Sequence, residues 1–356
     1  MAYSTINKPQ DHFNTLLYTG DGTSSQPQTG VGFQPDWTWI KTRSTTGGHQ
    51  IFDVIRGATK VLSSNTTDAE STNADSLKSF DSDGFTLGGS GGTSFNGRTY
   101  ASWNWLADGS ASSNTDGSIT SSVSANTTSG FSIVTWTGNA TDSTIGHGLS
   151  SAPEFIIVKN RTDLGNDWRI AQTVTASNNM TDGNGYYFDW NDTKASTNPG
   201  SAVLWGATPT APTSSVFTVG TNNGINGSGD DMLAYCFHSV KGYSKIGEYK
   251  GNGSTNGPFV YTGFKPAWLM VKVASGTTGR WYVFDNTRSV DNAVDKFLSV
   301  DSTNAESTSD TLDFCSNGFK FRSSNAAWNG AGNGHIYMAF AERSLVGTNG
   351  VPALAR

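Results

Sequence analysis

Short runs in which apolar residues occupy every position, or every second position, predict that this chain is built from β-strands. In residues 35–41, Trp37 and Trp39 alternate with smaller residues, so both rings are expected on one face of a strand. Residues Phe155–Val158 and Trp268–Val271 are apolar at every position. Such short continuous runs are typical of strands covered on both faces, as in the interior of a sandwich.

These three strands are copies of one another. Each copy has a proline, a lysine six residues later, and a turn glycine fifteen residues before the proline. The prolines are Pro35, Pro153 and Pro266, and the glycines are Gly20, Gly138 and Gly251. A spacing kept three times indicates a tandem repeat of a unit of roughly a hundred residues.

Further strands follow in each copy. Residues Asp83–Leu87, Ser215–Val219 and Asn317–Phe321 alternate apolar and polar residues, as half-buried strands do. Gly/Asn/Ser-rich turns separate the strands, and the chain shows no sustained helical period. The pattern predicts an all-β protein of three tandem β-sandwich (jelly-roll-like) modules of about 100 residues each.

The expected organisation runs from an N-terminal arm to a C-terminal tail. The arm is 1–12, the repeats are 13–107, 130–240 and 241–345, a Ser/Gly-rich linker is 108–129, and the tail is 346–356.

Composition narrows the class of protein. Of 356 residues, 12 % are aromatic and only 15 % are charged, the reverse of a disordered chain. The net charge of −6 and the absence of a Lys/Arg cluster argue against nucleic acid as a partner. No apolar run approaches the ~20 residues that cross a bilayer, so we expect no membrane insertion. The N-terminal residues lack the apolar stretch of a signal peptide, so we expect folding in a cytoplasm.

Chemistry-bearing residues are scattered. The five histidines have no partner at metal-ligand spacing, and the two cysteines, Cys236 and Cys315, are read as reduced, buried thiols. The acid pairs Asp81/Asp83 and Asp230/Asp231 are better explained as turn residues than as a glycosidase pair. We therefore expect no enzyme activity, no metal and no cofactor.

A Phe-Asp-x-x-Arg element occurs in the first and third copies only. It places Asp53 beside Arg56 and Asp285 beside Arg288, whereas the second copy has no such pair. The spacing predicts an internal ion pair or a turn cap, with a ligand-binding role for Arg56 or Arg288 as the alternative.

Three tryptophans lie outside the repeated strands. Trp190, Trp205 and Trp328 occur in Gly/Asn-rich segments that differ between the copies. Rings on loops beside Asn and Asp can stack on sugar faces, so these residues are the candidate glycan contacts. The alternative is that the rings pack beneath long loops.

Several motifs resemble a known family. They are Tyr-Thr-Gly-Asp-Gly (18–22), Gly-Phe-Gln-Pro-Asp-Trp-Thr-Trp-Ile-Lys (32–41), Ser-Trp-Asn-Trp-Leu (102–106), Ala-Pro-Glu-Phe-Ile-Ile-Val-Lys (152–159) and Gly-Pro-Phe-Val-Tyr-Thr-Gly-Phe-Lys-Pro-Ala-Trp (257–268). They resemble repeat-containing virion structural proteins of marine tailed bacteriophages, often labelled tail-fibre-like. The resemblance covers residues 13 to about 345 and implies a virion component that displays β-sandwich modules. It carries over no catalytic residues to this chain. The chain lacks the heptads and the long shaft of a typical fibre.

Three functions follow as hypotheses. The favoured one is a bacteriophage virion surface protein, tail-fibre-like or an appendage, that attaches to the host through cell-surface glycan. Its expected partners are other virion proteins, host glycan and further copies of itself in a homo-oligomer, with avidity from repeated sites. The alternative is a head-decoration or tail-adaptor protein without a receptor. A polysaccharide depolymerase is the third, and it would need an acid pair that the copies do not share.

Overall fold

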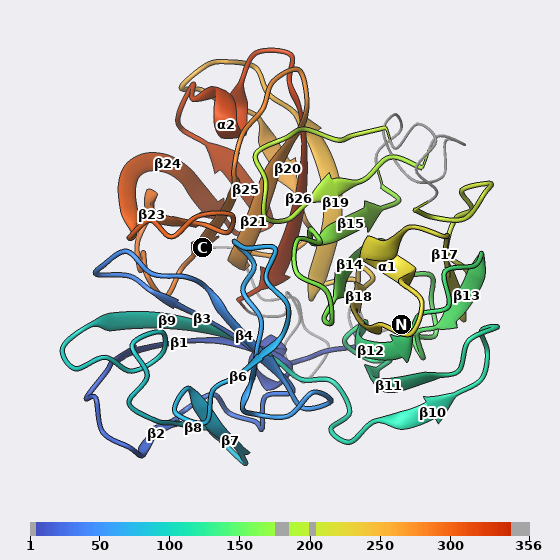
Figure 1. Cartoon of the computed structure of the whole chain (residues 1–356). Coiled ribbons are helices and arrows are strands. Elements are labelled where there is room, and N and C mark those ends of the chain that lie inside the picture. The colour runs from blue at the N-terminus through green and yellow to red at the C-terminus, as the bar shows by residue number, and fades with distance from the viewer. Residues whose placement is uncertain (1–4, 175–184, 199–203, 343–356) are drawn as a thin grey trace.

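The computed structural model describes residues 5–174, 185–198 and 204–342, and these are almost entirely β-structure (Figure 1). The all-β prediction is confirmed. The described helices are short: η1 (Pro9–Asp11), α1 (Asn223–Asn226) and α2 (Ala326–Asn329). The tail 346–356 and the end of the third repeat lie outside the described residues.

Three large antiparallel sheets, one for each repeat, organise the fold. Sheet 1 has the order β1 (Phe13–Thr19), β9 (Thr99–Trp105), β3 (Trp37–Thr42) and β4 (Gln50–Asp53). Sheet 2 has the order β10 (Ser112–Asn114), β11 (Ser121–Asn126), β12 (Phe131–Thr137), β18 (Asp231–Phe237), β14 (Phe155–Asn160), β15 (Arg169–Gln172) and β16 (Phe188–Asp189). Sheet 3 has the order β19 (Ser244–Lys250), β26 (Gly334–Ala341), β21 (Pro266–Ser275), β22 (Trp281–Asp285), β23 (Val294–Ser299), β24 (Ser307–Cys315), β25 (Gly318–Phe321) and β20 (Phe259–Tyr261).

Smaller sheets cover the outer faces of sheets 1 and 2. One consists of β2 (Gln26–Thr29), β8 (Gly84–Leu87) and β7 (Leu77–Asp81), with the pair β5 (Lys60–Val61) and β6 (Ser71–Thr72) beside it. The other consists of β13 (Ser143–Gly146) and β17 (Val216–Val219). In the third repeat, the corresponding strands β25 and β20 belong to sheet 3 itself, which curls around its own core.

The segment 108–129 is not a linker, contrary to the prediction from its Ser/Gly content. It contributes β10 and β11, and β11 pairs with residues Phe131–Thr135 along the outer edge of β12. Serine and asparagine suit this place because their small side chains stand on a half-exposed edge strand, so a composition typical of linkers also fits a sheet edge.

The three repeated strands hold the same register in their sheets. Trp37, Phe155 and Trp268 pair with Trp105, Phe237 and Phe340, respectively. This register defines which positions are equivalent in the three repeats.

Alternate residues of each repeated strand enter two different cores. Trp37 and Trp39 lie in one central cluster together with Phe155 and Trp268, whereas Ile156 joins a separate core inside its own repeat. The prediction that both tryptophans share a face is confirmed. The apolar runs are explained by burial on both faces: one face meets the other repeats and the other face meets the covering strands.

The three sheets therefore share a central core, which separate tandem modules would not (Figure 1). Large aromatic rings dominate it: Trp37 stacks on Tyr235 at a centroid distance of 4.5 Å, and Trp105 meets Trp268 at 5.6 Å. Each of these pairs joins two repeats. An isolated repeat would expose this aromatic face to water, which is costly at about 25 cal/mol per Å² of apolar surface.

Backbone hydrogen bonds join the repeats in a ring. The amide of Gly47 donates to the carbonyl of Thr303 (2.8 Å). The equivalent bonds are Gly165 to Thr67 (3.0 Å) and Gly279 to Thr193 (2.9 Å). Repeat 1 thus contacts repeat 3 in the same way that repeat 2 contacts repeat 1 and repeat 3 contacts repeat 2.

The repeated lysines strengthen the same ring. Lys41, Lys159 and Lys272 are fully buried, and each Nζ donates to a carbonyl of the neighbouring repeat. The acceptors are Asn304 (2.8 Å), Thr67 (3.2 Å) and Asp192 (3.2 Å), respectively. Burial lowers the pKa of each lysine to about 8. The lysine at the end of the repeated motif is thus a cross-link between repeats.

The residue after the repeated proline holds the connection to the next repeat. Asp36 accepts hydrogen bonds from the amides of Ala107 (2.7 Å) and Gly109 (3.2 Å), and Glu154 accepts one from the amide of Ser239 (2.9 Å). The third repeat has Ala267 at this position. The two carboxylates thus hold the connections from repeat 1 to repeat 2 and from repeat 2 to repeat 3.

Candidate functional site

The Phe-Asp-x-x-Arg elements form buried ion pairs, the first of the two readings of the motif. In the first repeat, Nε of Arg56 lies 2.5 Å from Oδ2 of Asp53, and both side chains are fully buried. The amide of Arg56 also donates to Oδ1 of Asp53 (3.0 Å), which caps the turn after β4. Burial would lower the pKa of Arg56, but the neighbouring Asp53, Tyr235 and Glu70 outweigh it and raise that pKa.

The third repeat repeats this geometry. Nε of Arg288 lies 2.5 Å from Oδ2 of Asp285, again with fully buried side chains. Both arginines also reach a glutamate of the Ala-Glu-Ser-Thr motif: Arg56 meets Glu70 at 3.1 Å and Arg288 meets Glu306 at 3.3 Å. Neither guanidinium is open to a ligand, so the ligand-binding alternative for Arg56 and Arg288 is not supported.

Each buried carboxylate accepts a hydrogen bond from another repeat. Tyr235 Oη of repeat 2 donates to Asp53 (2.7 Å), and Trp103 Nε1 of repeat 1 donates to Asp285 (3.0 Å). The position equivalent to Asp53 in repeat 2 is Gln172, and the residue of repeat 3 equivalent to the donors is Met338. A methionine cannot donate a hydrogen bond, so this third interface has no need of the carboxylate. The repeat without the motif is therefore the one whose facing residue cannot donate a hydrogen bond.

The three tryptophans proposed as glycan contacts are buried, and this proposal is wrong. Trp190 is 0 % exposed and packs against Trp39 and Trp168 in the central core, at centroid distances of 4.9 and 5.3 Å. Trp205 and Trp328 are 1 and 2 % exposed and belong to the cores of the second and third repeats. A ring without accessible faces cannot stack on a sugar, so the alternative reading, packing beneath long loops, is correct.

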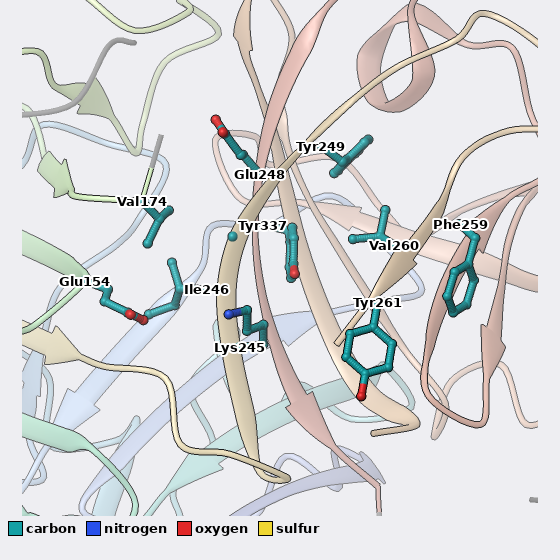
Figure 2. Close-up of a pocket in the computed structure, with 11 residues that line it drawn as sticks. Glu154, Val174, Lys245, Ile246, Glu248, Tyr249, Phe259, Val260, Tyr261 and Tyr337 are labelled. Carbon is teal, nitrogen blue, oxygen red and sulfur yellow. The ribbon is translucent and has the colours of Figure 1, made fainter. Parts of the chain in front are cut away.

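A concavity with exposed aromatic side chains lies between the two edge strands of sheet 3. It measures about 570 Å³ and lies between β19 and β20, with Glu154 and Val174 of the second repeat at one side (Figure 2). Phe259 and Tyr261 of β20 line it, and they are 46 and 60 % exposed. We call this concavity the seam groove.

The floor of the seam groove carries a buried phenol. Tyr337 of β26 is 4 % exposed and lies between the β19 and β20 side chains (Figure 2). Its hydroxyl has no hydrogen-bond partner among the described residues. Burial, with a contribution from Glu154, raises the pKa of Tyr337 to about 12, so the hydroxyl is a neutral donor at ordinary pH. A Cβ atom at Gly247 would lie 2.7 Å from this oxygen, so the glycine leaves it room.

Charged groups at the seam groove are mixed and exposed. Lys245 and Glu248 stand on β19, where both side chains are exposed, and Glu154 is held from the other side by Ser239. With two carboxylates and one ammonium, the groove favours a neutral polar ligand over an anionic one. Aromatic faces with hydroxyl and charged hydrogen-bonding groups are a chemistry that suits a polyhydroxylated ligand.

His49 and Cys236, two side chains of kinds that serve in catalysis or bind metals, are buried in the part of the chain that the structure describes. There, no group of three or more His, Cys, Asp or Glu side chains could hold a metal ion. His49 is fully buried, with Trp39 Nε1 donating to its Nδ1 (2.8 Å), and burial lowers its pKa to about 3. Burial also raises the pKa of the Cys236 thiol. Within the described ranges no helix has the length and apolarity to cross a membrane.

Sequence reasoning missed Phe259, Tyr261 and Tyr337. The first two were visible only as part of a motif, and Tyr337 occurs in an apolar strand where a core residue is expected. A comparison of the copies could have found Phe259 and Tyr261 only if the equivalent strands lay at equal distances from the turn glycines. They do not, because β20 begins eight residues after Gly251 whereas β2 and β13 follow Gly20 and Gly138 at other distances. The register becomes evident only from the partner strands.

The comparisons with known proteins identify a family but no activity. A family model described as a domain of unknown function (DUF7483) matches residues 8–344. The match spans all three repeats as one domain, in agreement with their shared core. A search of the curated proteins gave no match.

Proposed function

We propose that this chain, which belongs to the DUF7483 family of unknown function, is a bacteriophage virion surface protein that attaches to host cell-surface glycan without catalysing a reaction. The resemblance of its motifs to tail-fibre-like virion proteins supports the virion assignment. The seam groove, in place of the three buried tryptophans, is the proposed point of contact.

The observation that carries this proposal is the exposure of Phe259 and Tyr261 beside an open groove. Large exposed apolar side chains have a solvation cost, and where they line a concavity they mark a ligand site. The arginine pairs, the histidines outside the groove and the loop tryptophans are all engaged in packing or internal hydrogen bonds, so they offer no competing site.

The closed ring of repeats suits a surface protein. A body joined through an aromatic core and buried lysine cross-links resists local opening, since these connections are shielded from water. Such rigidity presents a binding groove in a fixed orientation, which lowers the entropic cost of binding.

Binding to intact cells tests the proposal. Purified protein is incubated with cells of candidate hosts, and bound protein is measured against concentration before and after periodate oxidation of the cell surface. Saturable binding that periodate abolishes is the expected result. Binding that survives periodate would point to a protein receptor, and no binding to any host of the parent phage would favour a head-decoration or tail-adaptor role.

A further inference from the structure

The three repeats differ at the outer positions of one equivalent strand. Val260, Gln28 and Ile145 are equivalent, because they pair with Phe319, Phe85 and Phe217 of β25, β8 and β17. All three point inward and are buried, at 7, 8 and 0 % exposure. The fold thus demands burial at this central position in every repeat.

The positions on either side of it lie on the opposite face, and here the repeats diverge; in repeat 2 the side chain of Asn114 covers one of them, Gly146. Repeat 3 has Phe259 and Tyr261; the same positions are Pro27 and Thr29 in repeat 1, and Thr144 and Gly146 in repeat 2. Two repeats build the same strand without aromatic residues, so packing does not require them. Their exposure in repeat 3 therefore needs another explanation than stability.

The two rings are arranged as a row. Phe259 and Tyr261 are two residues apart on one strand, so their side chains leave the same face roughly 7 Å apart. The row stands beside Tyr337, whose ring is buried and which lines the groove floor. Its hydroxyl is not among the buried polar atoms that lack a partner, so it faces the groove, where a ligand oxygen would accept its hydrogen bond in place of water.

The described residues of the equivalent junction between repeats 3 and 1 do not show these features. There, a smaller cavity of about 180 Å³ lies beside β1, the counterpart of β19, and Ala267 replaces Glu154. In repeat 2, β11 covers the edge of β12, which is the strand equivalent to β19. In the part of the chain that the structure describes, the wide groove with exposed rings is thus found at one of the three junctions.

From these observations we infer that each chain has a single carbohydrate site, the seam groove, which binds an internal stretch of a linear, uncharged polysaccharide. This inference rests on the proposed function and replaces the expected avidity from three repeated sites with one site per chain. Phe259 and Tyr261 stack on successive sugar rings, and Tyr337 donates a hydrogen bond to a sugar oxygen. A terminal sugar would instead need an enclosed pocket, and the seam groove is open.

The test uses the full chain and surface polysaccharide extracted from host cells, cut into fragments of increasing length. Calorimetric titration is expected to give one site per chain and an affinity that rises from disaccharide to longer fragments. Affinity should change little with added salt, because a neutral ligand forms no ion pairs.

Three variants connect the binding to the groove. Tyr261→Ala and Tyr337→Phe should each weaken binding roughly tenfold, through loss of a stacking surface and of one hydrogen bond. The matched control is Phe95→Ala, which removes a ring of similar exposure (49 %) in the first repeat. Unchanged tryptophan fluorescence and unfolding midpoint would show that the variants are folded.

The outcomes separate this inference from the proposed function. If the wild-type chain binds polysaccharide but both groove variants bind equally well, or if three sites titrate, the single-groove inference is overturned and host attachment stands. If fragments bind no better than a monosaccharide, the internal-chain assignment is overturned. If no host polysaccharide binds at all, the glycan function itself is overturned, and this inference with it.

Discussion

Replacement of Asp53 by asparagine tests the claim that a buried ion pair joins the first two repeats. The Asp53→Asn change keeps the shape of the side chain but removes the charge that lies 2.5 Å from Nε of Arg56 and accepts the hydroxyl of Tyr235 at 2.7 Å. Loss of one partner from a buried pair costs about 3–5 kcal/mol, because the other charge stays buried and unpaired. Since Glu70 still reaches Arg56 at 3.1 Å, we expect a loss near the lower end of that range, about 3 kcal/mol.

The assay is equilibrium unfolding in urea, followed by tryptophan fluorescence. For a slope of about 3 kcal/mol per molar urea, the unfolding midpoint should fall by roughly 1 M. The matched control is Asp11→Asn, because Asp11 forms an ion pair of the same spacing with Lys8, but there the side chains are 48 and 69 % exposed. An exposed pair contributes less than about 1 kcal/mol, so this midpoint should hardly move.

Equal, small shifts in the two variants would refute the argument. They would mean that the free energy of unfolding does not depend on the Asp53 charge, and that the motif persists in two repeats for some other reason. A shift for Asp53→Asn with none for Asp11→Asn would support an interface role and would lead us to expect a similar loss for Asp285→Asn.

Three further predictions concern titration and reactivity. The pKa of His49 is about 3 in the folded chain and 6.5 in the unfolded chain, so the unfolded chain binds more protons between these values. The free energy of unfolding should therefore fall by about 1.4 kcal/mol per pH unit as the pH drops below 6.5. His49→Gln should lessen that pH dependence when unfolding is measured in urea at several pH values. The pKa of Lys159 is about 8 in the folded chain and 10.5 in the unfolded chain, so the cost of burying its charged form should disappear as the pH rises between these values. The free energy of unfolding should therefore rise by about 1.4 kcal/mol per pH unit over that range, and Lys159→Met should remove this contribution to the slope. Under native conditions a thiol reagent should modify only Cys315, since Cys236 is fully buried. Mass spectrometry should find both cysteines modified only in denaturant. Modification of Cys236 under native conditions would contradict the packed core.

Much of the fold could be predicted from residue pattern. The spacing of Pro35, Pro153 and Pro266 revealed the repeat, and the alternation of Trp37 with Trp39 placed both rings on one face, as observed. These features are local, because a strand sends alternate side chains to opposite faces whatever it packs against. The linker was misjudged because Ser and Asn, which are common in flexible connections, also form β10 and β11 at the edge of sheet 2.

The candidate site was harder to predict, for a physical reason. Trp190 and Trp328 lie in Gly/Asn-rich segments, yet those segments fold over cores, and burial depends on residues far away in the chain. Tyr337 and Phe259 come together only because sheet 3 curls until its first and last strands face each other. Sequence spacing carries no information about such a closure.

By itself, the sequence determined the strands, their repetition and the Phe-Asp-x-x-Arg pairing, since each depends on residues close together in the chain. Only the tertiary structure decided which surface each strand face packs against. It also decided that Asp53 accepts a hydrogen bond from Tyr235 and Asp285 one from Trp103, and that, among the described residues, the wide groove lies at one of the three junctions. The reason is that burial and hydrogen bonding between repeats depend on how the repeats are placed relative to one another. The three copies have nearly the same surfaces, so the effect of a single difference, such as Met338 or Gly247, is evident only where two of those surfaces are in contact.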